Sequence, residues 1–280
     1  MFDIIEKIGN STVHHGKNSN RIYVMSLDPN DLPEITKNID ELARIKEYSK
    51  AIAKIPLEFK EVFEMSGYKE EAVIPYFFNG EKNCSFMCKY YDPSRKNDPF
   101  IDTCTENLNI ALKKEPETNT SSLSEKFTLR EATEKDIYEM AKLYKIVFKS
   151  YPFPIHDEKY ILKTMQENII YFGIWQGQNL VALSSIELAS KYSNAEMTDF
   201  AVLPDYRGYG FALYMLKNME KKLEKMGIKT AYTIARAMSA GMNITFAKNG
   251  YTFGGTLINN TDISGQIESM NVWYKNLNKA

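Results

Sequence analysis

Histidine is scarce in this sequence. It occurs three times in 280 residues, at His14, His15 and His156. Histidine is the commonest metal ligand and the usual base of a Ser-His-Asp triad. The composition therefore argues against a histidine-based metal site or triad, and we expect no metal.

Cysteine is equally rare, with Cys84, Cys88 and Cys104. This small, odd number gives no disulfide framework, and the pair Cys84 and Cys88 has no second pair of ligands at zinc-site spacing. We expect reduced thiols, as in a cytoplasmic protein.

Long apolar runs and an excess of one charge are also missing. No apolar stretch approaches the ~20 residues that span a bilayer. Residues 1–10 have no basic segment followed by an apolar one, so no secretory signal is expected. The 35 Lys and Arg residues balance 36 Asp and Glu residues, for a net charge of −1. We therefore expect a cytoplasmic protein with no nucleic-acid and no membrane partner.

The polar segment 113–126, which contains Pro116, interrupts the apolar pattern of the chain. Together with the residues before it, it is typical of a linker. The sequence therefore predicts an N-terminal domain over 1–92, a linker over 93–126 and a second domain over 127–280.

The second domain alternates between strand and helix patterns. Thr133 and Asp136 form a capping-box-like helix start, and Met215 and Met219 lie with Met226 on the apolar face of a later helix that Gly227 ends. The expected order is β-α-α-β-β-β-α-β-α-β-β, an α/β fold with a mixed sheet covered by helices. The strands are expected at 126–132, 169–176, 180–190, 195–203, 229–235, 251–258 and 268–277, and the helices at 133–148, 158–167, 210–226 and within 242–250.

The N-terminal domain has the same order as the end of the second. Strands at 21–27, 49–56, 69–78 and 84–91 alternate with helices within 28–48 and 57–68. This indicates a degenerate internal repeat, unless two α/β segments simply share a common order. Such a half-domain exposes an edge strand and an apolar face. We expect it to pack against the second domain, or against a second subunit in a homodimer.

A glycine-rich turn, LPDYRGYGFA, joins the strand at 195–203 to the following helix. Backbone N–H groups at such a turn, with the helix N-terminus and Arg207, favour an anion such as a diphosphate. The alternative is an ordinary turn in which Gly208 and Gly210 relieve only steric crowding. The N-terminal copy has no such turn.

With Arg207, Gly210 and Ala212 in Arg-x-x-Gly-x-Ala spacing, this turn resembles the acetyl-CoA pyrophosphate loop of the GNAT N-acetyltransferase superfamily. The resemblance implies a GNAT fold over 127–280, preceded by a degenerate half-GNAT-like α/β domain, and acetyl-CoA as co-substrate. It implies that the diphosphate is held by the backbone amides of Gly208, Tyr209, Gly210, Phe211 and Ala212. It also implies that the pantetheine arm pairs with Phe200, Ala201 and Val202.

A narrower resemblance extends over nearly the whole chain. Residues 197–212, 230–243, 245–257 and 268–277, and residues 67–90 of the N-terminal domain, are similar to the β-lysine N6-acetyltransferase family. That resemblance implies acetylation of the terminal amine of β-lysine to give Nε-acetyl-β-lysine, a compatible solute used in osmoadaptation.

Two carboxylates are candidates for the catalytic base that deprotonates the amine. Glu196 lies where several GNAT enzymes carry a catalytic glutamate, and Asp199 is the alternative. Period-two alternation sends their side chains to opposite sides of the strand, unless a bulge intervenes.

The sequence departs from the superfamily pattern at one position. Aligned on Gly250 and Tyr251, the tyrosine that usually protonates the thiolate falls at Phe246, which cannot donate a proton. The CoA-contacting asparagine falls at Ser239, with Asn243 one turn later. Tyr209, Tyr251 or water would then serve as the acid, or the thiolate leaves unassisted, since its pKa is near 8.5.

Acceptor-binding residues are expected where polar side chains face the cleft, at Arg236, Glu268 and Asn271. The aromatic loop 151–157 is a candidate lid, or packs on the core. Two other functions remain open: an acetyltransferase for another small diamine, a polyamine or lysine, and a CoA-binding sensor without catalysis.

Overall fold

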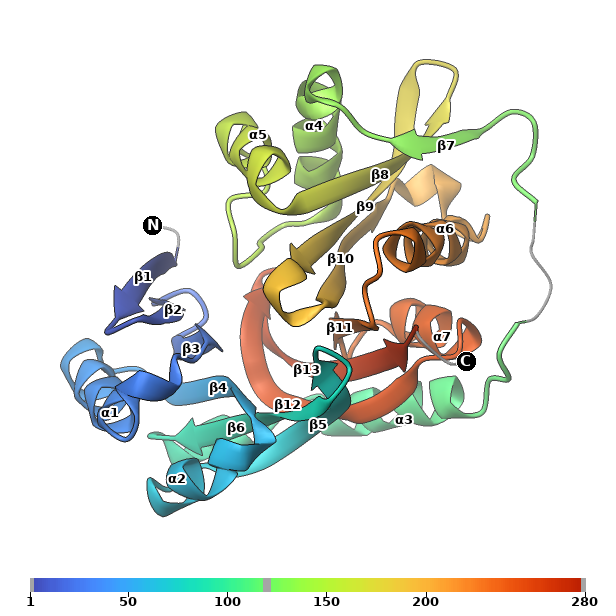
Figure 1. Cartoon of the computed structure of the whole chain (residues 1–280). Helices are drawn as coiled ribbons and strands as arrows, with labels where there is room; N and C mark the ends of the chain where they lie inside the picture. Colours follow the sequence, from blue (N-terminus) through green and yellow to red (C-terminus); the bar gives the residue numbers. More distant parts are fainter. Residues whose placement is uncertain (1–2, 118–121, 278–280) are drawn as a thin grey trace.

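The computed structural model describes residues 3–117 and 122–277. Residues 118–121 of the expected linker lie outside this range. The chain forms one 13-stranded mixed sheet, in the order β1-β2-β3-β4-β6-β5-β12-β13-β11-β10-β9-β8-β7, with helices against it (Figure 1). The expected α/β class and mixed sheet are confirmed.

Between residues 3 and 117 the structure shows six strands and two α-helices of the N-terminal half, followed by a third α-helix. They are β1 Ile4–Ile8, β2 Ser11–Gly16, β3 Arg21–Ser26, α1 Glu34–Lys46, β4 Lys50–Pro56, α2 Lys60–Met65, β5 Lys69–Phe78, β6 Lys82–Tyr90 and α3 Ile101–Leu112. The sequence did not predict β1, β2 or α3. The helix α3 lies inside the segment 93–126 and packs against α7, so the first part of the expected linker is folded.

The C-terminal half follows the predicted order from its first strand to its last. Its elements are β7 Thr128–Glu131, α4 Ile137–Val147, α5 Glu158–Glu167, β8 Ile169–Gln176, β9 Asn179–Ala189, β10 Asn194–Val202, α6 Phe211–Lys225, β11 Thr230–Arg236, α7 Ala240–Lys248, β12 Thr252–Ile263 and β13 Gln266–Asn276. The capping box of Thr133 and Asp136 is present before α4.

The strand order is nearly the same when read outward from the centre of the sheet in either direction. From the β5–β12 junction it runs β5-β6-β4-β3-β2-β1 on one side and β12-β13-β11-β10-β9-β8-β7 on the other. In both halves a parallel pair, β3–β4 or β10–β11, is followed by two antiparallel strands. This correspondence is what the repeat hypothesis requires.

The junction between the halves needs a glycine. Ala72 of β5 pairs with Gly255 of β12, where φ is +141° and a Cβ would lie 2.2 Å from the carbonyl oxygen of Glu71. Only a residue without a side chain permits this approach. Beside it, Lys50 Nζ donates to the carbonyl oxygen of Ile258 at 2.7 Å and to Glu71 at 3.1 Å. The N-terminal half therefore packs against the C-terminal half of its own chain.

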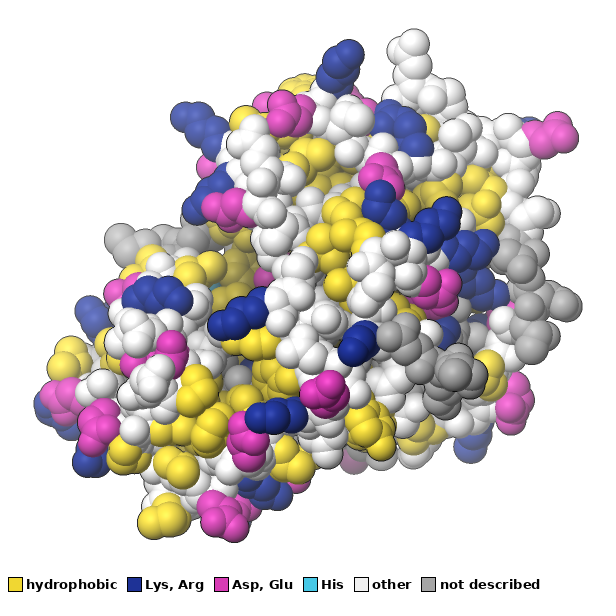
Figure 2. Space-filling view, viewed as in Figure 1, with side chains coloured by type: hydrophobic (Ala, Val, Ile, Leu, Met, Phe, Trp, Pro, Cys, Tyr) yellow, Lys and Arg dark blue, Asp and Glu magenta, His cyan; other side chains and the backbone are white. Residues whose placement is uncertain are grey.

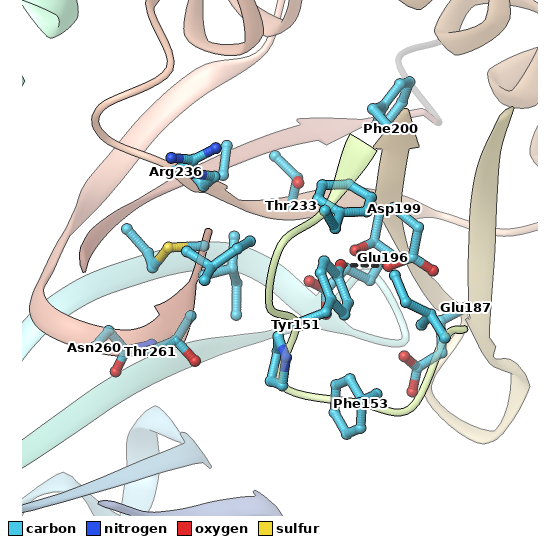
Figure 3. A pocket seen from close by; sticks show the side chains of 18 of the residues that line it. Tyr151, Phe153, Glu187, Glu196, Asp199, Phe200, Thr233, Arg236, Asn260 and Thr261 are labelled. Carbon is cyan, nitrogen blue, oxygen red and sulfur yellow. Dashed lines mark hydrogen bonds between the residues drawn. The ribbon is translucent and has the colours of Figure 1, made fainter. Parts of the chain in front are cut away.

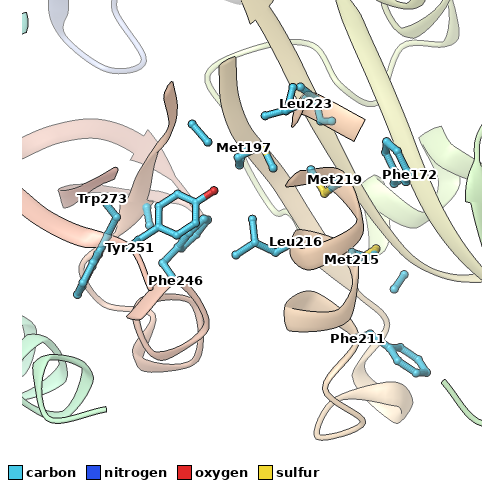
Figure 4. Close-up of a cluster of buried hydrophobic side chains, with 14 of the residues drawn as sticks. Phe172, Met197, Phe211, Met215, Leu216, Met219, Leu223, Phe246, Tyr251 and Trp273 are labelled. Atoms are coloured by element: carbon cyan, nitrogen blue, oxygen red, sulfur yellow. The ribbon is translucent and has the colours of Figure 1, made fainter. Parts of the chain in front are cut away.

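Helices α6 and α7 cover one face of the C-terminal half, and α4 and α5 the other. Figure 4 shows Leu216 of α6 pointing toward Phe246 and Met197, with Met215 on the other side of the helix. The apolar face predicted for this helix is confirmed except at Met226, which follows its last turn and is 42% exposed. On the face shown in Figure 2, positive and negative side chains are interspersed.

Candidate active site

A bulge in β10 brings the two candidate bases to the same side. Thr198 pairs with Ser185 of β9, but the next pair joins Ala201 to Leu183, so β10 contains one extra residue. Asp199 sits in the bulge with φ of +55°. Glu196 and Asp199 therefore do not point to opposite sides: the exception that the sequence left open, a bulge, is present and resets the alternation.

The sheet opens between β10 and β11. Within the described residues, their parallel pairing extends only from Asn194 to Glu196 on β10. Farther along, β10 pairs only with β9, up to Val202, and β11 only with β13, up to Arg236. The stretch from Phe200 to Val202 therefore offers an unpaired strand edge, with Ala201 buried and its two neighbours half-buried.

The glycine-rich turn follows this edge directly. Gly208 and Gly210 have φ of +87° and +75°, and no atom lies within 4 Å of the position a Cβ would take at either. Arg207 is exposed beside them. No group in the described chain accepts a hydrogen bond from the backbone N–H groups of residues 208–213. Free donors at the start of the 15-residue helix α6 are the groups that an anion site here requires, and the anion site itself stays a prediction.

A cavity of about 150 Å³ lies between the two halves, next to the opening in the sheet. Strands β9 and β10 supply Glu187, Glu196 and Asp199, while β12 supplies Asn260 and Thr261 on the opposite side (Figure 3). The cavity is also lined by Arg21, Tyr23 and Lys54 from β3 and β4, by Tyr151 and Phe153 from the aromatic loop, and by Phe200, Arg236 and Phe246.

Three carboxyl groups interact in this cavity. Burial and, after it, the charge of Glu187, directly opposite on β9, raise the pKa of Glu196 to about 7. Burial also raises the pKa of Glu187. The charge of Lys54 lowers the pKa of both glutamates. Burial lowers the pKa of Lys54 itself, but nearby acidic groups that include Glu196 raise that pKa above its usual value. A carboxyl group that titrates near 7 suits a general base.

Asp199 is held by hydrogen bonds. Its Oδ1 accepts from the Tyr151 hydroxyl and its Oδ2 from Ser185 Oγ at 2.5 Å. Burial raises its pKa and these donors lower it. Because both oxygens are engaged, Asp199 is less available than Glu196 to accept a proton.

Comparison with known proteins agrees with this geometry. Residues 138–251 match the acetyltransferase (GNAT) family. Over 275 residues the chain is 42% identical to the β-lysine N(6)-acetyltransferase of Methanococcus maripaludis, which covers 98% of this chain and 99% of that protein. The chain belongs to the GNAT acetyltransferase family. It is therefore an acetyltransferase that uses acetyl-CoA, as the sequence predicted.

Two further relatives have similar names. The β-lysine N(6)-acetyltransferase of Methanosarcina mazei is 34% identical over 264 residues, 87% of this chain and 97% of that protein. The N-acetyltransferase YodP of Bacillus subtilis is 34% identical over 222 residues, 79% of this chain and 78% of that protein.

The structure places Asn243 of the acetyltransferase in the core and not at a cofactor surface. Its amide nitrogen donates to the carbonyl oxygens of Arg236 and Ser239, and its Oδ1 accepts from Asn271 and Trp273, all at 2.8–2.9 Å. The side chain has no free donor or acceptor for CoA, contrary to the sequence expectation. Ser239 is the N-cap of α7 and accepts from Met242 N at 3.4 Å.

Two of the three expected acceptor-binding residues do not line the cavity. Arg236 lines it but is paired with Glu268, with Nε–Oε2 at 2.9 Å and Nη2–Oε1 at 2.7 Å. Glu268 is buried behind this ion pair. Asn271 is buried between Asn243 and Thr256. Glu268 and Asn271 are three residues apart in β13, so they lie on opposite faces of this strand, and both faces are buried there.

Phe246 is fully buried and contacts Phe200 edge-on, with ring centroids 5.7 Å apart. Neither tyrosine offered as a substitute acid lines the cavity: Tyr251 is buried behind Phe246, and Tyr209 is exposed on the turn.

Sequence reasoning missed Arg21, Lys54 and Glu187, all of which line the cavity. A charged residue inside each of three strands that are otherwise mostly buried was a usable signal. Among the described residues no cluster of acidic, His or Cys side chains has the arrangement of a metal site. No helix within that part of the chain is long and apolar enough to cross a membrane.

The raised pKa of Glu196 has a consequence for stability. The group titrates near 7 in the folded state and near its ordinary 4.5 when unfolded, so its contribution is present below pH 4.5 and is lost as pH rises through 7. Glu196→Gln is expected to raise the melting temperature at pH 8 and to change it little at pH 5. Thermal unfolding at both values tests this, with Glu61→Gln, exposed on α2, as control. If Glu196→Gln raises the melting temperature at pH 8 by no more than at pH 5, the raised pKa of Glu196 is contradicted.

Proposed function

We propose that the enzyme acetylates the N6 amine of β-lysine to give Nε-acetyl-β-lysine. The observation that carries this proposal is the 42% identity, over nearly the full length, to a protein named β-lysine N(6)-acetyltransferase. The cavity supports it, because acidic groups lie on one side and unpaired polar atoms on the other. A substrate with an amine at one end and polar groups at the other suits such a cavity.

The cofactor-binding residues follow from the opening in the sheet. When bound, acetyl-CoA supplies an acetyl group activated as a thioester. We propose that the unpaired edge of Phe200, Ala201 and Val202 binds its pantetheine arm, and that the free N–H groups of the turn, with Arg207, bind its diphosphate. The equivalent connection in the N-terminal half, between β3 and α1, carries Asp28 and Asp31 instead, and acidic side chains there disfavour a diphosphate.

We propose Glu196 as the base. A lysine-like ammonium has a pKa near 10.4, so few of these groups are neutral at pH 7. Glu196 Oε accepts the proton from N6, which leaves the nitrogen lone pair free to attack. Asp199 would act as a positioning residue that fixes the Tyr151 hydroxyl and, through it, the aromatic loop over the cavity. With Phe246 in place of an acid, we propose that the thiolate leaves unassisted or takes a proton from water.

The test is steady-state thiol release from acetyl-CoA by the purified protein, with β-lysine, α-lysine and spermidine as acceptors and mass spectrometry of the product. We expect the highest kcat/KM with β-lysine and acetylation at N6. A preference for spermidine would favour the polyamine alternative. Family membership, with a buried carboxyl group titrating near 7 beside the sheet opening, speaks against a non-catalytic sensor.

Acetylation removes one positive charge and leaves a neutral zwitterion, which supports a compatible-solute role in osmoadaptation within the cytoplasm. A homodimer also stays a prediction. The edge strand β1 exposes Ile4 and Ile5 by 49% and 54%, and light scattering of the purified protein decides whether two chains associate.

A further inference from the structure

Arg21 is a buried cation without a counter-ion. It lies on β3, is 5% exposed and lines the cavity. Its Nη1 donates to the carbonyl oxygen of Asn260 at 2.9 Å, while its buried Nε has no acceptor. Asp3 and Glu196 act on its charge, but within the described chain neither forms an ion pair with it. A buried charge with no partner is costly, and a ligand that supplies the opposite charge removes that cost.

Arg95 shows what a purely structural buried arginine looks like in this protein. Its Nε, Nη1 and Nη2 donate to Asn259 O, Ser49 Oγ and Ser19 O at 2.7–2.8 Å, and it does not line the cavity. Arg21 lines the cavity and leaves its Nε without an acceptor. A purely structural role in holding the two halves together therefore does not account for its donors.

Two unpaired acceptors lie near Arg21. Asn260 Oδ1 and Thr261 Oγ1 are buried without a hydrogen-bond partner, and both residues line the same cavity. Asn260 lies within the irregularity in β12 between Leu257 and Thr261, and Thr261 is where the pairing resumes. In Figure 3 they face the cavity from the side opposite Glu196 and Asp199. A free donor on a cation and two free oxygens complement a carboxylate and an ammonium group.

We propose that Arg21, Asn260 and Thr261 bind the amino-acid end of the acceptor. The Arg21 guanidinium binds the carboxylate, and Asn260 Oδ1 and Thr261 Oγ1 accept hydrogen bonds from the second ammonium group. The inference rests on the proposed function, since it takes β-lysine as the acceptor with N6 at Glu196. It assigns selectivity against polyamines to Arg21, because an amine without a carboxylate leaves the buried guanidinium unpaired.

The test compares three acceptors in wild type and Arg21→Met. β-Lysine has both groups, 6-aminohexanoate lacks the second amine, and pentane-1,4-diamine lacks the carboxylate. We expect Arg21→Met to raise KM roughly 100-fold for the first two, with little change in kcat and in KM for acetyl-CoA. The KM for pentane-1,4-diamine should stay the same or fall.

A second variant guards against misfolding of the first. Thr261→Val keeps the side-chain volume and removes a hydroxyl that has no partner in the protein. It should raise KM about tenfold for β-lysine and for the diamine, but not for 6-aminohexanoate. Thr252→Val, exposed on the same strand, is the matched control.

The outcomes separate the two proposals. If wild type acetylates β-lysine and Arg21→Met changes KM for all three acceptors equally or not at all, the carboxylate site is wrong and the function stands. If wild type uses α-lysine but not β-lysine, with the same dependence on Arg21, the function is wrong and the site stands. A wild type that prefers pentane-1,4-diamine overturns both. If no acceptor turns over, calorimetry with 6-aminohexanoate decides, and equal binding by wild type and Arg21→Met overturns the site.

Discussion

Glu196→Gln is expected to lower kcat about 100-fold at pH 7, the usual contribution of a positioned general base. The wild-type rate should rise with pH and level off above about 7, where Glu196 is ionised. The variant should instead gain about tenfold per pH unit, because it depends on the free amine in solution, whose pKa is near 10.4. The defect therefore shrinks at high pH. A pH series of kcat and kcat/KM measures both effects.

Glu187→Gln is the matched control. It removes the charge opposite Glu196, so the pKa of Glu196 falls and the rise in kcat/KM moves to lower pH without being lost. If Glu196→Gln is fully active at pH 7 and Asp199→Asn is inactive, the base is Asp199.

Gly210→Val is expected to raise the Kd for acetyl-CoA roughly 100-fold, since hydrogen bonds to charged groups contribute about 1.5–3 kcal/mol each. The added side chain occupies the open space over the free N–H groups at the start of α6. Calorimetric titration with acetyl-CoA measures the change.

Gly227→Val controls for backbone strain. Gly227 follows the other end of α6, with φ of +72° against +75° at Gly210, and its Cβ position is equally open. Both variants should lose similar stability, but only Gly210→Val should lose affinity. If the two folded variants bind acetyl-CoA with equal affinity, the turn does not bind the diphosphate.

The C-terminal half was predictable because its signals are local. Apolar periodicity, the capping box at Thr133 and the glycines at 208, 210 and 227 fixed its elements within a few residues. The strands β1 and β2 were missed although they form consecutive hairpins with each other and with β3. β1 is almost wholly exposed and β2 is mostly polar, so neither shows an alternating apolar pattern. Helix α3 was missed because only Cys104 and Ala111 are buried in it, which leaves a weak apolar stripe.

The site was predictable only where a motif carried it. The turn and Glu196 came from the motif and its resemblance. A one-residue bulge has no pattern in a single sequence, so the sequence could name it only as an exception to the expected facing of Asp199. Asn243 and Asn271 were polar residues in a suitable place, yet their hydrogen bonds with each other and with Trp273 satisfy the core. Arg21 reaches the cavity because the fold brings it into contact with Asn260 of β12, 239 residues away in the chain, although β3 and β12 are not neighbours in the sheet.

The proposed cofactor site lies within the C-terminal half of the chain, whereas the proposed acceptor site draws residues from both halves. The turn and the open edge of β10 belong to the C-terminal half, whereas Arg21, Tyr23 and Lys54 come from β3 and β4 of the other. Residues that share no partner contribute to free energy almost independently. Substitutions in β3 and β4 can therefore change the range of acceptors while affinity for the cofactor is preserved, and a chain built this way can acquire a new substrate one half at a time.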